Sequence, residues 1–538
     1  NINSATSITG PITVYGGYID VNANITATGG DILLDAYTSG SSNTGEDGVN
    51  IDAGLTVQTL TSGDITLLGR SGNSSTSGLI GVEIGLTSGP DVTISSVGDL
   101  TIEGVSESGN SSVTRGIWLK NGTYSAVGDI YLEGTANSTN KFDVSGQNSI
   151  LQSSGGAILI YTNNTNGKYV SSVSNTLSAQ NNISIYADEI SLAGLTVTAS
   201  GPFELIPRST SFTADVTYPL SGATISSSGL TIGKSGNTSN ISFTGDYSTT
   251  GDVKLYGTTV DINNLTTTGG SLTLEGSMTV DANKALVVQD EITNNGTITV
   301  ENGGSLVQNS TTGTNSNTGT GYTVKRNSGV LPDDSRFQYW SSPVQTATMG
   351  NMFPNSDPTD FYYYSPGIGW ISQSSGANMT PGVGYITTGS VGLSNGSETR
   401  TFTGAVNNEN ISVAVNASSD DFILAGNPYP SAISVANFLA DNTDLYGTVY
   451  YWNHTTNPNT NGGLNYNTDY AAWNSSGGTA SGNNNKTPNG YISAMQSVFV
   501  QAENPVNQLQ FQNDQRVSGN NTQFFKNDTR ERVWLSLE

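Results

Sequence analysis

The 538-residue chain has no cysteine and a single histidine, His454. Disulfides, thiolate metal sites and cysteine nucleophiles are therefore excluded, and a zinc site would depend on carboxylates with at most one imidazole. A Ser-His pair would need a positioned partner for His454, which follows a strand-like Tyr-Trp-Asn segment at 451–453. We interpret His454 as a packing residue and expect no catalytic residue, whereas the metal content stays open.

Charge is also scarce, and it is mostly of one sign. Charged residues make up 11% of the chain, and 18 Lys and Arg against 43 Asp and Glu give a net charge of -25. A nucleic-acid backbone requires clustered cations, so no nucleic-acid partner is expected. The carboxylates leave calcium as an alternative to solvated turn residues, and no other cofactor is expected. No apolar run approaches the roughly 20 residues of a membrane-spanning helix, so no transmembrane segment is expected.

A short glycine-containing motif recurs through the first part of the chain. Its clearest copies are GDILLDA at 30–36, GDITLLG at 63–69, GDLTIEG at 98–104 and GDIYLEG at 128–134. Apolar and polar residues alternate after each turn, so Ile65 and Leu67 should point to one face of a strand and Thr66 to the other. Each copy therefore predicts a half-buried strand.

No helical pattern separates these strands, so crossover helices cannot connect them into an ordinary parallel sheet. Stacked coils solve the pairing problem, because each strand bonds to the coil above and the coil below. We predict an all-β fold in which residues 1–325 form a parallel β-helix, right-handed as in the common form, with about 20 residues per coil. A string of antiparallel sandwich modules is the alternative, although the motif recurs too closely for domains of about 100 residues.

The composition changes after Arg326, where large aromatic residues begin to cluster. They include Phe337, Tyr339, Trp340, Trp370, Tyr385, Tyr450, Tyr451, Trp452, Tyr470 and Trp473. Rings supply buried area that small-residue repeats lack, so residues 326–538 are predicted to form a compact aromatic-rich β-domain. The best helical stretch within it is Ser434 to Leu439.

Residues 301–538 carry an ordered series of motifs. These are GGSLVQ at 303–308, YWSSPV at 339–344, PGVGYI at 381–386, FTGAVNNENISV at 402–413, LAGNPYPSAIS at 424–434, GTVYYWNHTT at 447–456, YISAMQSVFVQA at 491–502 and FFKNDTRERVWLSL at 524–537. In these motifs the chain resembles the region before the C-terminal sorting signal of large Bacteroidetes surface proteins exported by the type IX secretion system. It departs from them at Ser493–Phe499, where a glycine-containing stretch is usual.

The resemblance implies an extracellular, outer-membrane-associated location on the cell surface. It also implies the type IX translocon and outer-membrane shuttle proteins as partners, and a sorting domain downstream of a chain that we expect to be part of a longer protein. Many proteins of this kind are adhesins, some associated with gliding motility, and others carry enzymes upstream.

Three sets of residues are candidates for particular roles. The repeated acids Asp31, Asp64, Asp99, Asp129 and Asp252 each come directly after a glycine, which favours capping of the turn backbone over catalysis. In the second domain Tyr470 and Trp473, next to the Asn- and Gly-rich segment 474–485, are the predicted ligand-binding residues, because exposed rings stack on sugars. The motif Gly426, Asn427, Pro428, Tyr429 and Pro430 is predicted to be a rigid, fold-defining turn.

From the sequence we therefore expect a non-catalytic cell-surface adhesin or stalk segment that presents or spaces a binding region, with surface polysaccharide as a candidate partner. The alternative is a secreted polysaccharide-degrading enzyme on a β-helix scaffold, in which two acids flank a glycosidic bond. A spacer that serves an active region upstream is the third interpretation.

Overall fold

A computed structural model describes residues 1–37, 45–73, 78–108, 114–137, 142–309, 319, 321–453, 469–481 and 487–521. His454 and the motif at 524–537 lie outside these residues. The regular secondary structure of the described chain consists almost entirely of strands, which confirms the predicted all-β class. It divides into two compact units, one of residues 1–245 and 249–260 and one of residues 246–248 and 261–538. Among the described residues no helix is long and apolar enough to cross a membrane.

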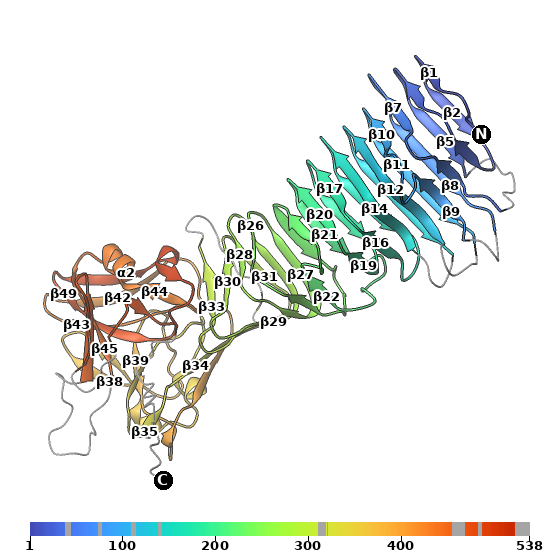
Figure 1. Cartoon of the computed structure of the whole chain (residues 1–538). Coiled ribbons are helices and arrows are strands. Elements are labelled where there is room, and N and C mark those ends of the chain that lie inside the picture. Colours follow the sequence, from blue (N-terminus) through green and yellow to red (C-terminus); the bar gives the residue numbers. More distant parts are fainter. Residues whose placement is uncertain are drawn as a thin grey trace, which may run out of the picture. The chain divides into compact units, whose positions relative to one another are not determined.

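The first unit is a parallel β-helix whose strands stack in columns (Figure 1). The first column contains β1 (Thr6–Ile8), β4 (Ile25–Ala27), β7 (Thr56–Thr59), β10 (Val92–Ser96), β12 (Arg115–Ala126), β14 (Phe142–Ser153), β17 (Asn175–Ala179), β20 (Leu195–Ala199) and β23 (Thr224–Ser226). The second contains β2 (Ile12–Tyr15), β5 (Ile32–Ala36), β8 (Ile65–Arg70), β11 (Leu100–Ser106), β13 (Ile130–Ala136), β15 (Ile158–Thr162), β18 (Ile183–Tyr186), β21 (Pro202–Ile206), β24 (Gly229–Ile232) and β27 (Val253–Asp261).

A third column completes most coils. It contains β3 (Ile19–Val21), β6 (Val49–Ile51), β9 (Ile80–Ile84), β16 (Lys168–Ser172) and β19 (Glu189–Leu192), with β22 (Val216–Tyr218) and β25 (Ile241–Phe243) pairing further along the chain. The long strands β12 and β14 serve two columns, because β12 pairs with β9 through its first residues and with β10 through its last. All these pairings are parallel, so the alternative of antiparallel sandwich modules is wrong for the repeats.

The strands follow the predicted alternation. Ile65 and Leu67 are fully buried, and Thr66 between them is half-buried on the outer face. In register, Ile32, Ile65 and Leu100 stack directly on one another inside the coil. These rows of aliphatic side chains form the core of the first unit, and burial of each contributes about 1.5–3 kcal/mol relative to an exposed side chain.

The repeated aspartates form a ladder along the stack. The carboxylate of Asp64 accepts a hydrogen bond from the backbone N–H of Asp99 at 2.8 Å, and Asp99 does the same for Asp129 at 2.7 Å. Asp31 caps Asp64, and Asp129 caps Ala157. These four acids thus cap backbone as expected, but in the following coil rather than in their own turn, whereas the role of Asp252 stays a prediction. Each capping Asp and the residue that it caps are one coil apart, and the four separations are 33, 35, 30 and 28 residues. The expected length of about 20 residues per coil is therefore wrong for these coils.

The glycine before each capped position is required by the ladder. A Cβ atom on Gly98 would lie 1.9 Å from the Asp64 carboxylate, and one on Gly128 would lie 2.0 Å from that of Asp99. Such contacts are far inside van der Waals distance. The recurring Gly-Asp pair is therefore one device, in which Asp reaches along the stack and Gly leaves room for the Asp of the coil before.

We expect Asp99→Ala to lower the free energy of unfolding of the first unit by about 1 kcal/mol, because the Asp129 N–H loses its acceptor at an exposed site. Asp99→Asn keeps an oxygen in the same place and should stay within a few tenths of a kcal/mol of the wild type. Urea unfolding followed by circular dichroism compares the two variants. Equal stability of the Ala and Asn variants would contradict the capping role.

The second unit opens with further parallel coils and then changes to antiparallel pairing. Its parallel strands are β28 (Leu265–Thr267), β30 (Ala285–Val288) and β33 (Ser305–Gln308) in one column, and β29 (Leu272–Val280), β31 (Ile292–Asn294), β32 (Thr297–Val300) and β34 (Tyr322–Asn327) in another. β26 (Tyr247–Thr249) precedes them. Strand β34 also pairs antiparallel with β41 (Thr399–Thr403). Parallel pairing therefore ends near the boundary expected at residue 325, whereas the second compact unit starts earlier.

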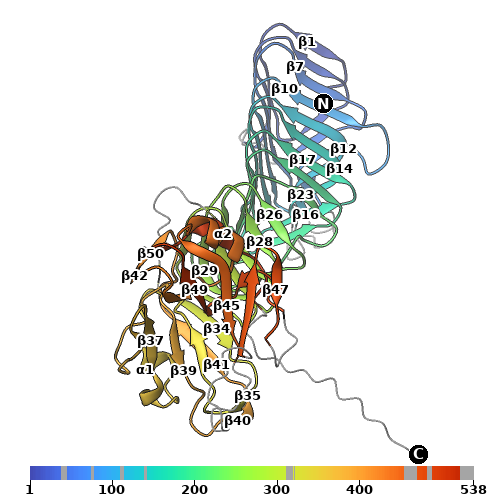
Figure 2. The same ribbon diagram turned by 90° about the vertical axis from the view of Figure 1, so that its left-hand side faces the viewer.

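The remaining strands form small antiparallel sheets (Figure 2). A four-stranded sheet has the order β36 (Gln338–Trp340), β39 (Tyr385–Thr387), β37 (Tyr362–Ser365) and β38 (Gly369–Ser372). A five-stranded sheet has the order β43 (Phe422–Gly426), β49 (Ser497–Ala502), β45 (Leu445–Trp452), β46 (Tyr470–Asn474) and β47 (Gly477–Thr479). Smaller sheets are β35 (Leu331–Asp333) with β40 (Ser394–Gly396), β42 (Ile411–Ala417) with β50 (Val506–Phe511), and β48 (Tyr491–Ile492), β44 (Ala432–Ser434) and β51 (Arg516–Val517).

Helices are few and short. They are α1 (Met349–Met352), α2 (Val435–Asp441) and the 3₁₀ turns η1 (Pro358–Asp360) and η2 (Asn513–Gln515). The helix expected at Ser434 to Leu439 is confirmed as α2, with Ser434 as its N-cap: the hydroxyl accepts from the Asn437 N–H at 3.4 Å.

Candidate functional site

The five-stranded sheet has two different faces. On β45, Val449 and Tyr451 belong to a mainly aliphatic core, whereas Tyr450 and Trp452 lie on the opposite face in an aromatic cluster. On β49, Val498 and Val500 likewise join the aliphatic core. Because side chains alternate along a strand, every second residue contributes to the aromatic face.

The aromatic face lines a pocket of about 560 Å³. Eight of its nine described lining residues are aromatic, and they come from the four-stranded and the five-stranded sheets: Tyr339, Tyr364, Trp370, Phe422, Tyr450, Trp452, Tyr470, Ala472 and Phe499. We call the space that these rings line the aromatic pocket. Its volume falls within the roughly 300–1,000 Å³ typical of small-molecule sites.

The floor of the pocket is fixed by ring contacts and hydrogen bonds. Tyr339 stacks on Trp452 with a centroid distance of 5.3 Å and an interplanar angle of 7°. The Trp452 indole N–H donates to the carbonyl of Phe337 at 2.9 Å, and the Tyr339 and Tyr470 hydroxyls are hydrogen-bonded at 2.7 Å. Phe499 meets Tyr364 edge to face at 4.9 Å. A floor held in this way is preorganised.

The rim is more open. Trp370 and Phe422 retain 42% and 39% of their exposure, whereas Tyr339, Trp452 and Phe499 in the floor are buried. A Cβ atom on Gly367, at the tip of the β37–β38 hairpin, would lie 3.5 Å from the Asp421 carboxylate, so this tip lies beside the start of β43. The pocket therefore opens between the hairpin and the first residues of β43.

No Asp, Glu, Lys, Arg or His is among the described residues that line the pocket. The polar side-chain groups of this described lining are the phenol hydroxyls of Tyr339, Tyr364, Tyr450 and Tyr470 and the indole N–H groups of Trp370 and Trp452. The described lining therefore supplies ring faces, ring edges and hydroxyls, but no carboxyl or imidazole group for general acid-base chemistry at neutral pH.

The structure separates the two predicted binding residues. Tyr470 lies in the pocket, but Trp473 points to the other face of β46, where it packs against the aliphatic core, and a Cβ atom on Gly490 would lie 3.0 Å from its indole. Part of the predicted segment 474–485 lies outside the described residues. Sequence reasoning missed Trp370 and Phe422, although period-two alternation in the strand at 450–452 was a usable signal for the aromatic face.

The motif at 426–430 lies at the centre of the second unit. Asn427 is completely buried, and its side-chain amide donates to the carbonyls of Ser431, Ile492 and Ser493 at 2.8–3.0 Å. Its side-chain oxygen accepts from the Tyr429 N–H at 3.0 Å. One side chain thus satisfies backbone groups of two segments that are far apart in sequence.

The other residues of this motif are equally constrained. A Cβ atom on Gly426 would lie 2.5 Å from the Ser341 hydroxyl, so only glycine fits. The Pro428 carbonyl accepts from the Asn407 side chain at 2.8 Å, and the Pro430 carbonyl accepts from the Leu306 N–H at 3.0 Å. Among the described residues the cis peptide bond recorded is Tyr218–Pro219, so the bond before Pro430 is trans.

Tyr429 and Arg516 tie the motif to the last parallel coil. Tyr429 is fully buried, its hydroxyl donates to the Glu409 carbonyl at 2.7 Å, and the Arg516 guanidinium lies 4.8 Å from its ring centroid. Arg516 in turn donates to the Leu306 carbonyl of β33 at 2.8 Å. This contact, with that of Pro430, explains why the last coils belong to the second compact unit.

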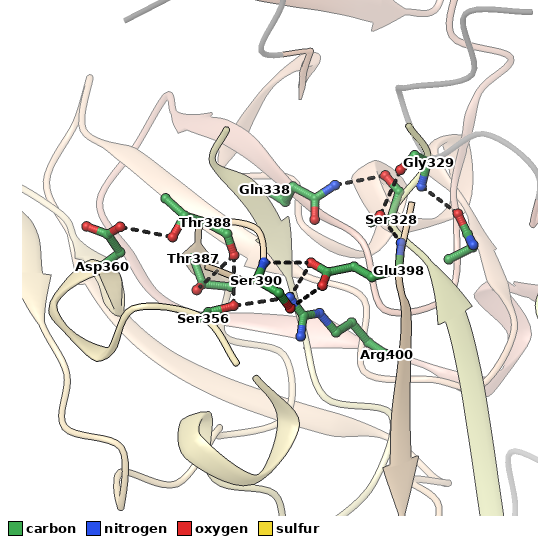
Figure 3. A network of polar contacts seen from close by, with 11 residues as sticks. Ser328, Gly329, Gln338, Ser356, Asp360, Thr387, Thr388, Ser390, Glu398 and Arg400 are labelled. Atoms are coloured by element: carbon green, nitrogen blue, oxygen red, sulfur yellow. Dashed lines mark hydrogen bonds and ion pairs between the residues drawn. The ribbon is translucent and has the colours of Figure 1, made fainter. Parts of the chain in front are cut away.

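A second buried polar network lies beside β41 (Figure 3). Arg400 forms an ion pair with Glu398 and donates to the Ser356 hydroxyl at 3.1 Å, and Ser390 donates to Glu398 through both its N–H and its hydroxyl. The side chains of Arg400 and Glu398 are 5% and 14% exposed. Ser356 continues the network to the Thr388 carbonyl at 3.0 Å. Its members bond to one another, so we interpret the network as structural.

A mixed cluster of charges lies on the third column of the first unit, around Lys120 and Glu83. Lys120 is buried and forms an ion pair with Glu83, one coil earlier. The Lys120 ammonium and the Arg115 guanidinium lie 4.2 and 3.8 Å from the Trp118 ring centroid. Asp47 caps the Ile80 N–H at 2.7 Å. The pKa of Asp47 is raised from 3.8 to about 7. The larger cause is burial of the carboxyl group, and the second is its hydrogen bond with the Glu83 side chain.

The raised pKa of Asp47 makes stability depend on pH. The folded state holds this proton more tightly than the unfolded chain, so stability falls as the pH rises from about 4 to about 7. Asp47→Asn keeps the capping oxygen without the charge. We expect the variant to be as stable as the wild type near pH 4 and more stable by about 2 kcal/mol at pH 8. The difference at pH 8 is measured as a higher melting temperature of the variant.

The matched control is Asp52→Asn, at an exposed aspartate. It should leave the difference between the melting temperatures at the two pH values unchanged. A melting curve of Asp47→Asn that follows the wild type at both pH values would show that the Asp47–Glu83 contact does not hold a proton.

The described residues contain no group of three or more His, Cys, Asp or Glu side chains placed to hold a metal ion. Calcium therefore has no assigned site, and the metal content stays a prediction.

The fold and the pocket define a class: an all-β protein with a parallel β-helix and an aromatic-rich antiparallel region. Residues 249–538 match a family described as a domain of unknown function, DUF8693, and because the match covers more than half of the chain, the protein belongs to this family. The matched range contains the last parallel coils, the buried motif at 426–430 and the aromatic pocket. No curated protein and no solved structure matches the chain.

Proposed function

We propose that this chain is a non-catalytic segment of a cell-surface adhesin, exported by the type IX secretion system and held at the outer membrane. The second unit contains the binding region, and the β-helix precedes it in the chain as a stalk. Surface polysaccharide is the partner, and the type IX translocon and outer-membrane shuttle proteins handle the export. The resemblance of residues 301–538 supports the location, and the fold supports the role.

The observation that carries the proposal is the aromatic pocket. Its described lining is concave and preorganised, and it lacks the carboxyl or imidazole groups that turnover of a glycan requires. Four of the repeated aspartates support the same conclusion, because the carboxylates of Asp31, Asp64, Asp99 and Asp129 each cap backbone in the next coil.

The second candidate function is polysaccharide degradation on the β-helix, and a specific observation favours it. Burial raises the pKa of Asp47 to about 7, its side chain is hydrogen-bonded to that of Glu83, and Lys120 and Trp118 lie next to them. An acid with a raised pKa next to a second carboxyl group is an arrangement that glycoside hydrolysis uses. Against it, the Lys120 side chain is 3% exposed and already engaged with Glu83.

The two candidates differ in turnover. The whole chain is incubated with a panel of polysaccharides, and reducing ends, unsaturated products and bound protein are measured together. Binding without product supports the adhesin. Product formation that disappears in Asp47→Asn and Glu83→Gln would overturn it in favour of the enzyme.

The export route has its own test. In cells with an intact type IX translocon the protein should be cleaved by protease added outside, and in cells lacking the translocon it should be protected. Surface exposure without the translocon would contradict the proposed route.

A further inference from the structure

We propose that the aromatic pocket binds a neutral hexopyranose unit of a polysaccharide, with Trp370 and Phe422 as its stacking platforms. This inference rests on the proposed function, to which it adds the site and the ligand class.

The shape and size of the pocket favour a ring-shaped ligand. Two rim rings keep about two-fifths of their surface exposed although they border a volume of about 560 Å³. A pyranose has a flat face of C–H bonds that packs on an aromatic ring. A sugar bound in this way removes the exposed apolar surface of a Trp or Phe ring from water, which is favourable. The pocket volume exceeds that of one small group such as an ammonium head group. The end of a polysaccharide chain, or a bend in it, therefore fills the pocket better.

The polarity of the lining favours a ligand that carries hydroxyls. Four tyrosine hydroxyls border the pocket, and those of Tyr339 and Tyr470 form a pair at 2.7 Å. A phenol hydroxyl can both donate and accept a hydrogen bond, as the hydroxyls of a sugar do. A lipid tail would remove these phenols from water without replacing their hydrogen bonds, which costs free energy, whereas sugar hydroxyls replace them.

The charge of the site favours a neutral sugar over an acidic one. A uronate needs a cationic partner when it enters a desolvated pocket, and no Lys, Arg or His is among the described lining residues. The chain also has a net charge of -25, which repels polyanions at long range. Neutral glycans meet neither penalty.

The test compares binding of neutral and acidic hexasaccharides to the full chain. The probes are cellohexaose, laminarihexaose, mannohexaose and hexagalacturonate. Isothermal titration calorimetry measures the dissociation constant of each. Trp370 and Phe422 lie on the rim of the pocket. The variants Trp370→Ala and Phe422→Ala should therefore have melting temperatures close to that of the wild type. Each should weaken binding of at least one neutral probe by about tenfold or more.

The control is Tyr15→Ala, because Tyr15 is a large exposed ring in the first unit, 64% exposed. It should leave binding unchanged. A second variant, Tyr470→Phe, removes one hydroxyl of the floor pair but keeps the ring, and it should weaken the same neutral probe by about threefold.

Several results would overturn the inference. They are binding of none of the neutral probes, preference for hexagalacturonate, displacement of the bound probe by phosphocholine or an aromatic dipeptide, and loss of affinity in Tyr15→Ala equal to that in the rim variants. All of these leave an adhesin that uses another surface or ligand. Release of shorter oligosaccharides in the same samples would instead overturn the non-catalytic function itself.

Discussion

Asn427→Ala should lower the free energy of unfolding of the second unit by about 3–5 kcal/mol. The change deletes the donors that bond the carbonyls of Ser431, Ile492 and Ser493, and the acceptor for the Tyr429 N–H, at a position with no solvent exposure. Water cannot replace these bonds without opening the core, so several backbone groups stay unpaired. Urea unfolding followed by tryptophan fluorescence measures the effect, because five of the six tryptophans lie after residue 326.

Asn437→Ala is the matched control. Asn437 lies on the exposed side of α2, and its side chain makes a single hydrogen bond to the Asp514 carbonyl at 3.1 Å. Its loss should cost less than about 1 kcal/mol. If Asn427→Ala were no more destabilising than this control, the motif at 426–430 would not be a determinant of the fold.

Arg400→Leu should destabilise the second unit by about 3–4 kcal/mol, again in urea unfolding. Removing the guanidinium leaves the Glu398 carboxylate without its cation at a site where water is largely excluded. The Ser356 hydroxyl also loses a donor. Most of this loss comes from leaving the Glu398 charge buried without a partner, and less of it from losing the attraction between the two charges. The attraction is already offset in part by the burial of Arg400 itself, which also lowers the pKa of its guanidinium.

A double variant separates these two costs. Arg400→Leu with Glu398→Leu removes both charges, and stability should recover by at least about half of the loss in Arg400→Leu alone. A double variant as unstable as the single one would assign the loss to the packing of the Arg400 side chain, which lies 5.1 Å from the Phe353 ring centroid, rather than to the Glu398 charge.

Local sequence pattern was sufficient for the β-helix. The alternation of Ile65, Thr66 and Leu67 fixes which side chains enter the core, because a strand has a period of two. The coil length was not predictable from the clearest motif. That motif marks one column, whereas residues such as Ile80–Ile84 form a third column with no turn signature of its own.

The pocket could be predicted only in part. The aromatic clustering after residue 326 indicated ring contacts, and Tyr470 was placed in the pocket. Its neighbours there come from strands more than 100 residues apart, as in the pair of Tyr339 and Tyr470, and that pairing depends on which sheets meet. Trp473 shows the same limit, since a strand's two faces cannot be assigned to core or pocket before the partner sheets are known.

The aspartate ladder has a mechanical consequence for the first unit. Strands of neighbouring coils bond across the stack, so a tension applied along its axis loads all the hydrogen bonds of one coil interface at once rather than one after another. Each Asp carboxylate adds a further bond to that same interface, outside the strands. Rupture then requires simultaneous failure of a whole layer, which is the arrangement that resists a sustained pull along the stack.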